Sequence, residues 1–134
     1  MGYRVAERSE ERIRAKTSFF HGTDYSSAQN IVNNGVSTEA GRSFGGDGSF
    51  WAIITSPGEV RNAASMARFF AQANPAESPK WAIITFEVSS EILVELKSKG
   101  LLEVRAEFAR FLPDALSRLN EVTSFRICES GTSG

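Results

Sequence analysis

Two short apolar runs constrain the fold of this 134-residue chain more than any other feature. Residues 50–55 read Phe-Trp-Ala-Ile-Ile-Thr, and residues 80–88 read Lys-Trp-Ala-Ile-Ile-Thr-Phe-Glu-Val. Runs this continuous in large apolar residues are typical of strands covered on both faces, so both are predicted as interior strands of a sheet. The shared Trp-Ala-Ile-Ile-Thr does not indicate a repeat, because the sequences on either side of it differ.

Capping and breaking residues divide the rest of the chain into further elements. Asp24 or Ser26 is expected to begin a helix that Gly35 ends, and Ser56 to begin another that ends before Pro75. Ser89 or Ser90 begins a third helix that Gly100 stops. The other predicted elements are a strand at residues 17–21, one or two strands within 101–111, a helical turn at 113–120 and a strand at 122–128. Strands and helices interspersed without regular alternation predict an α+β domain.

Length and composition limit the kinds of function that are expected of this chain. One domain is expected at residues 17–128, preceded by a charged lead-in or linker at 1–16 and followed by a flexible tail at 129–134. A net charge of −1 gives no basis for nonspecific nucleic-acid binding. A single cysteine and a single histidine argue against a disulfide framework and a Cys/His zinc site. With no long apolar run and no signal peptide at its start, the chain is expected to be soluble.

A motif around the only histidine points to a binding site. Residues 19–23, Phe-Phe-His-Gly-Thr, are followed by the helix that Gly35 ends, and then by the glycine-rich aromatic segment 44–52. That segment lacks the Lys-Ser/Thr of a phosphate-binding P-loop, and no Ser-His-Asp set is recognisable. The ordered combination resembles the nicotinamide-binding half of the ADP-ribosyltransferase superfamily. The similar branch is the His-Tyr-Glu branch, which includes diphtheria-like toxins and poly-ADP-ribose polymerases.

The resemblance covers roughly residues 19–111 and implies both a fold and an activity. The implied fold is α+β, with two small packed β-sheets, flanking helices and NAD bound in the cleft between the sheets. The implied activity is transfer of ADP-ribose from NAD to a macromolecular acceptor, with release of nicotinamide and without a metal. Two alternatives stay open on the same scaffold: an NAD glycohydrolase without an acceptor, and a non-catalytic relative that binds NAD, ADP-ribose or a protein.

The resemblance also assigns roles to individual residues. His21 would bind the adenosine-side ribose as a neutral imidazole and contribute to catalysis, the Gly22 backbone would bind the nicotinamide amide, and Thr23 would support them. The two family tyrosines that stack on the nicotinamide correspond to Phe50 and Phe69. Phenylalanine keeps the stacking and the cation–π attraction to the pyridinium but lacks the hydroxyl, which is why an inactive relative stays open.

The remaining roles concern charged residues. Glu107 is the favoured catalytic carboxylate, and it would bind the nicotinamide-ribose 2′-hydroxyl and stabilise the positive charge that develops on the sugar. Glu103 and Glu129 are the alternatives; Glu103 would share a strand face with Glu107. Arg42, more than Asp47, could contact the pyrophosphate, because phosphate needs a cation.

The charged residue two positions before Glu107 bears on the acceptor. Transferases that modify arginine carry Glu or Gln there, so Arg105 argues against an arginine acceptor. The Glu-Phe-x-x-Phe-x-Pro segment from Glu107 looks like the toxin domains at the C-termini of bacterial secreted proteins. It implies a secreted effector that acts in a target-cell cytoplasm on a protein acceptor, with a cognate immunity protein as partner.

Overall fold

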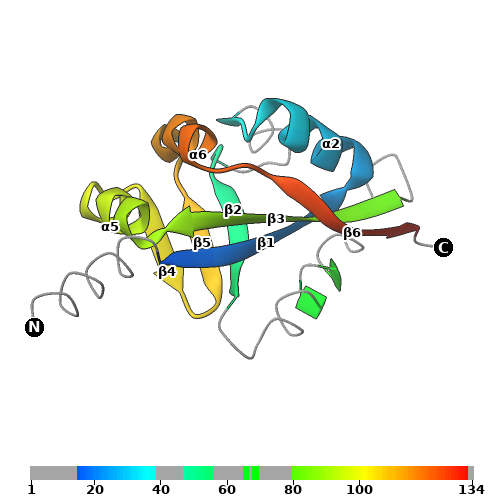
Figure 1. Cartoon of the computed structure of the whole chain (residues 1–134), viewed down its shortest axis with the longest axis horizontal. Coiled ribbons are helices and arrows are strands. Elements are labelled where there is room, and N and C mark those ends of the chain that lie inside the picture. The colour runs from blue at the N-terminus through cyan, green and yellow to red at the C-terminus, as the bar shows by residue number, and fades with distance from the viewer. Residues whose placement is uncertain (1–14, 39–46, 56–64, 67, 70–79, 133–134) are drawn as a thin grey trace, which may run out of the picture.

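The computed structural model describes residues 15–38, 47–55, 65–66, 68–69 and 80–132. Within them the chain is α+β: six strands form one open antiparallel sheet in the order β4-β5-β2-β1-β3-β6, with three α-helices packed around it (Figure 1). The strands are β1 (Lys16–Asp24), β2 (Phe50–Thr55), β3 (Lys80–Ser89), β4 (Leu102–Arg105), β5 (Phe108–Phe111) and β6 (Arg126–Thr132). The helices are α2 (Tyr25–Asn34), α5 (Ser90–Ser98) and α6 (Leu116–Val122), the last preceded by a 3₁₀ turn, η1 (Pro113–Ala115).

The sheet consists of two groups of three strands with a narrow connection. β1 pairs with β3 along all nine of its residues, Lys16 to Asp24, whereas it pairs with β2 only at Ser18, Phe19 and Phe20. The two sheets expected from the resemblance are therefore not confirmed. The described strands form one hydrogen-bonded sheet, because those three pairs join β6-β3-β1 to β2-β5-β4.

Both faces of the sheet are apolar, as the composition of the interior strands predicts. On β3, Ala82, Ile84, Phe86 and Val88 belong to the main core, and Trp81 and Ile83 belong to a second cluster. Alternate residues of a strand point to opposite faces, so the two clusters lie on opposite sides of the sheet. Figure 1 shows α2, α5 and α6 on one side, where they cover the main core.

Phenylalanine rings form the centre of the main core. The Phe19 ring stacks on Phe86 at 5.1 Å between centroids and meets Phe111 edge-on at 5.5 Å. Phe125 packs against Phe86 at 5.0 Å, and Phe50 packs against Phe86 at 5.8 Å. The aromatic-rich composition is therefore used largely to hold β1, β2, β3 and β5 together.

Local capping signals predict the helix ends correctly. The Asp24 carboxylate accepts a 2.9 Å hydrogen bond from the Ser27 N–H at the start of α2, and Gly35 ends that helix with a φ of 85°. Ser89 caps α5, and Gly100 follows it with a φ of 70°. The backbone therefore adopts a positive φ where glycine tolerates it.

Two predicted boundaries change in the structure, and one open alternative is resolved. β1 runs on to Asp24, because it pairs with β3 along its whole length. The predicted strand at 122–128 instead occupies Arg126–Thr132, where it pairs with β3, so a flexible tail from residue 129 is wrong for residues 129–132. Of the one or two strands predicted within 101–111, the structure has two, with a turn at Ala106 and Glu107.

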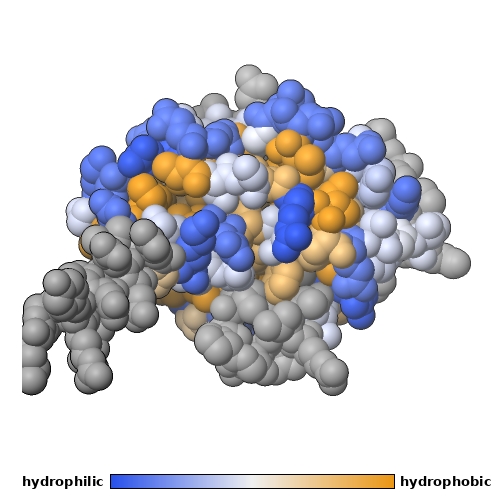
Figure 2. Space-filling view, in the orientation of Figure 1, coloured by the Kyte–Doolittle hydropathy of each residue, from blue (hydrophilic) through white to orange (hydrophobic). Residues whose placement is uncertain are grey.

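Several predictions fall partly or wholly outside the described residues. The lead-in at 1–14, Arg42 and most of the helix expected from Ser56 lie there, although residues 65, 66, 68 and 69 of that helix are described and are helical. On the face seen in Figure 2, hydrophilic residues surround separate small apolar groups in the part that the described residues cover. None of the described helices is long and apolar enough to cross a membrane.

Candidate functional site

A cleft lies where β1 and β2 stop pairing. It has a volume of about 350 Å³ and is lined by Phe20, His21 and Gly22 of β1, Trp51, Ala52 and Ile53 of β2, and Phe108 of β5. The last paired residues of the two strands are Phe20 and Ile53. Beyond them the strands separate, so His21 and Gly22 lie at the start of the opening.

The hydrogen-bond pattern of the sheet shows which backbone groups face this opening. The Ile54 N–H donates to the Glu107 carbonyl of the neighbouring hairpin at 2.7 Å, so Ile53 and Trp51 direct their N–H and C=O groups toward β1. Phe20, opposite Ile53, directs its groups toward β2, and Gly22 does the same two residues later.

If the pairing continued beyond Phe20, Gly22 would lie opposite Trp51. Instead, the Trp51 carbonyl accepts a 2.6 Å hydrogen bond from His21 Nδ1. The Gly22 N–H, the Gly22 carbonyl and the Trp51 N–H therefore face the opening as donor, acceptor and donor.

The His21 imidazole is held in one tautomer. Because a carbonyl only accepts, Nδ1 must carry the proton, and Nε2 is then the acceptor nitrogen of the neutral ring. Burial lowers the pKa of His21 below its ordinary value, and the bond to the Trp51 carbonyl opposes that shift only in part. The His21 ring is therefore neutral at neutral pH, and it packs against the Phe50 ring at 4.4 Å between centroids.

The two adjacent aromatic residues of β2 have different environments. The Phe50 ring is only 8% exposed, and its neighbours are His21 at 4.4 Å, Phe86 and Phe125. Trp51 is 53% exposed and lines the cleft. The structure therefore places Phe50 in the core, next to His21, and presents Trp51 as the accessible ring, a residue that the sequence prediction did not select.

The other residues predicted around the nicotinamide lie away from this cleft. Thr23 is buried, and its hydroxyl donates to the Asp24 carboxylate at 3.4 Å, next to the start of α2. Phe69 is 66% exposed, on the described part of the helix expected from Ser56, and does not line the cleft.

The three candidate carboxylates differ in their partners. Glu103 is bound to Arg110 at 3.0 Å, and Glu129 is bound to Arg68 at 2.5 Å. The Glu107 carboxylate has no hydrogen bond or ion pair with any residue that the structure describes. Glu107 is therefore the one of the three candidates that forms no ion pair with a described arginine.

Glu107 lies in the turn between β4 and β5, not within a strand, so the expectation that it shares a strand face with Glu103 is wrong. Its position is two strands from β1 and two residues along from His21. In the strand order of the sheet, β2 therefore lies between the two residues. A ligand that lies across β2 could reach both residues.

The Asp47 carboxylate has partners within the chain. Its carboxylate accepts from the Ser49 N–H at 2.9 Å and is bound to the Arg110 guanidinium. Hydrogen bonds from Ser49, with a further contribution from Arg110, lower the pKa of Asp47 to about 2. Asp47 therefore stabilises the chain before β2, and Arg110 is a second residue near the cleft that the sequence prediction did not select.

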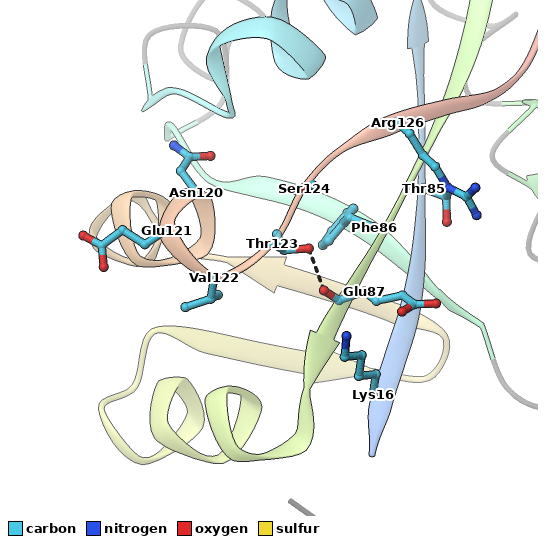
Figure 3. A pocket seen from close by; sticks show the side chains of 10 residues that line it. All are labelled: Lys16, Thr85, Phe86, Glu87, Asn120, Glu121, Val122, Thr123, Ser124 and Arg126. Atoms are coloured by element: carbon cyan, nitrogen blue, oxygen red, sulfur yellow. Dashed lines mark hydrogen bonds between the residues drawn. The ribbon is translucent and has the colours of Figure 1, made fainter. Parts of the chain in front are cut away.

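A larger cavity, of about 540 Å³, lies where the chain before β6 separates from β3 (Figure 3). Its lining comes from Lys16, residues 85–87, residues 120–124 and Arg126, and it contains none of the predicted site residues. The Thr123 hydroxyl in it donates to the Glu87 carbonyl at 2.6 Å, and the Thr85 hydroxyl donates to the Phe19 carbonyl at 3.1 Å. The smaller cleft at His21 is the better candidate, because it combines an exposed aromatic ring with backbone groups that are not paired between the described parts of β1 and β2.

Among the described residues, no group of three or more His, Cys, Asp or Glu side chains could hold a metal ion. Comparisons of the chain with protein-family models, with curated proteins and with solved structures find no match.

Proposed function

We propose that this chain is an NAD-dependent ADP-ribosyltransferase. The observation that carries the proposal is the unmade backbone pair between Gly22 and Trp51, with the His21 imidazole bound to the Trp51 carbonyl beside it. A nicotinamide carboxamide offers one carbonyl acceptor and an NH₂ donor. Backbone donors and an acceptor in a strand opening complement that group, and glycine allows a ligand to approach the backbone closely.

The remaining ligand groups have matching neighbours. The exposed Trp51 ring offers the aromatic face that a charged pyridinium prefers. His21, neutral and with Nε2 as acceptor, suits a ribose hydroxyl. This arrangement supports an ADP-ribosyltransferase-like fold for the chain, with Trp51, in place of the predicted Phe50 and Phe69, as the aromatic ring exposed in the cleft.

The proposed reaction breaks the bond between the ribose anomeric carbon and the nicotinamide nitrogen. Its electron pair leaves with nicotinamide, which becomes neutral, while positive charge develops on the ribose. Glu107 stabilises that charge and binds the 2′-hydroxyl. A nucleophile of the acceptor then bonds to the anomeric carbon and loses its proton. We propose that the acceptor is a protein, modified at a residue other than arginine. We also propose that the chain acts as a bacterial effector whose partner is an immunity protein. Both proposals rest on the resemblance of the sequence motifs.

The test is release of nicotinamide from NAD by the purified chain, with and without added cell protein. We expect E107Q to abolish release while the Kd for NAD changes by less than about tenfold, because the carboxylate acts in the transition state. The matched control is E95Q, which removes a carboxylate that Arg118 already binds, away from the cleft. It should retain release.

The other outcomes separate the alternatives. Release without labelling of any acceptor would indicate a glycohydrolase. NAD binding without release would indicate a non-catalytic relative. Absence of both binding and release would contradict the proposal.

A further inference from the structure

A row of side chains crosses three strands beside the cleft. Glu103 of β4 lies opposite Arg110 of β5, and Arg110 lies opposite Trp51 of β2. Directly opposite residues share a face of the sheet, so the three side chains are neighbours there. The Arg110 guanidinium carbon lies 5.6 Å from the centre of the Trp51 ring, in cation–π geometry.

Arg110 also binds the chain that leads into β2. Its Nε donates to the Ser49 hydroxyl at 3.2 Å, one terminal nitrogen donates to Glu103 at 3.0 Å, and the other donates to Asp47. One guanidinium therefore connects the β4–β5 hairpin, the segment before β2 and the ring of Trp51. Only arginine has planar donors in a fork that can bind this many groups at once.

These contacts do not leave Arg110 available as a ligand for a phosphate, because two carboxylates already occupy its guanidinium. They do restrain the orientation of Trp51, which is half exposed and would otherwise sample several rotamers. A side chain that is ordered before binding does not lose that freedom when a ligand arrives.

We propose that Arg110 is a positioning residue, which holds the Trp51 ring and residues 47–49 in place at the cleft so that a flat ring can stack on Trp51. Only the identity of that flat ring, a pyridinium, rests on the proposed function. Ordering one free side chain costs about two- to tenfold in affinity, so this is the expected contribution of Arg110 to ligand binding.

The test uses the indole N–H signals of the protein in ¹⁵N NMR spectra. The chain has two tryptophans, so W51F assigns the two indole signals. R110M should shift or broaden the Trp51 signal and leave the Trp81 signal in place. The matched control is R118M, because Arg118 also binds two carboxylates, Glu95 and Glu121, but on α6. It should leave both signals unchanged.

A second variant tests the same proposal in case R110M does not fold. D47A removes one carboxylate from the exposed side of the cluster and should shift the Trp51 signal in the same direction. An unchanged Trp51 signal in a folded R110M, or in D47A where R110M does not fold, would overturn the proposal.

The functional measurement is NAD affinity. R110M should raise the Kd for NAD by about two- to tenfold with little change in the turnover of bound NAD, because positioning acts on binding. An unchanged Kd in R110M would contradict the role in ligand binding. If the unmodified protein binds no NAD, the proposed function fails, and the indole signals still decide whether Arg110 positions Trp51.

Discussion

Adjacent aromatic residues on β2 allow the sharpest test of the site. Phe50 and Trp51 point to opposite faces of the sheet, the first into the core and the second to the cleft. Replacement of each by alanine should therefore damage different properties of the protein. F50A should reduce mainly stability, and W51A should reduce mainly ligand binding.

The expected magnitudes follow from the burial of the two rings. Phe50 is 8% exposed among three other aromatic rings, so F50A should leave a cavity and lower the free energy of unfolding by about 3–5 kcal/mol. Trp51 is 53% exposed, so roughly half of the about 250 Å² of a tryptophan side chain is covered. At about 25 cal/mol/Å² this gives an upper bound of about 3 kcal/mol. We expect about 1–2 kcal/mol for W51A, because its open site leaves no closed cavity.

Urea unfolding followed by circular dichroism measures both free energies, and equal m-values would show that the two variants unfold from comparably compact states. NAD affinity is measured on the same samples, with F50L as a milder core variant in case F50A is largely unfolded. W51A should weaken NAD binding by more than tenfold, whereas F50L should change it by less than about threefold because its Leu side chain stays in the core. The reasoning is refuted if W51A costs more stability than F50A, or if F50L abolishes binding while W51A preserves it.

Three further predictions concern Asn120, His21 and Asp47. N120A should lower the free energy of unfolding by about 2–4 kcal/mol in urea, because the Asn120 amide bonds both the N–H and the C=O of buried Val36 at 2.9 Å; a loss below 1 kcal/mol would contradict this. The lowered pKa of His21 means that the unfolded chain binds its proton first, so stability should fall as the pH drops below about 6.5, and H21Q should show a weaker decline in urea titrations at pH 7, 6 and 5. Carbon NMR should show the Asp47 carboxyl titrating at a pKa of about 2, and R110M should raise that pKa; a midpoint near 4 in the unmodified protein would show that the cluster does not form in solution.

Local signals predict the parts of the fold whose causes are local. The caps at Asp24, Gly35 and Ser89 follow from one or two residues each, because a helix end needs a partner for its own backbone groups. The interior strands follow from the apolar runs, since only a covered strand can be apolar at consecutive positions. The turn before Glu107 is different: Ala106 adopts a φ of 52° there without a glycine or asparagine to signal it.

The choice between Phe50 and Trp51 shows why the site is harder to predict than the fold. Every residue from 50 to 54 is apolar, so the period of two that separates the faces of a strand cannot be read from hydrophobicity. The face is decided by pairing with β5, in which Phe50 lies opposite the buried Phe111 and Trp51 lies opposite Arg110. Those partners are about 60 positions away in the chain.

By itself, the sequence determined the α+β class, the ends of α2 and α5, the interior strands and the placement of His21 in a strand. These depend on local propensity and on the burial that composition demands. Only the tertiary structure decided that β1 and β2 separate after Phe20, that Arg110 connects Asp47, Glu103 and Trp51, and that the strands form one sheet. These features depend on strand register, which arises from contacts between residues distant in sequence.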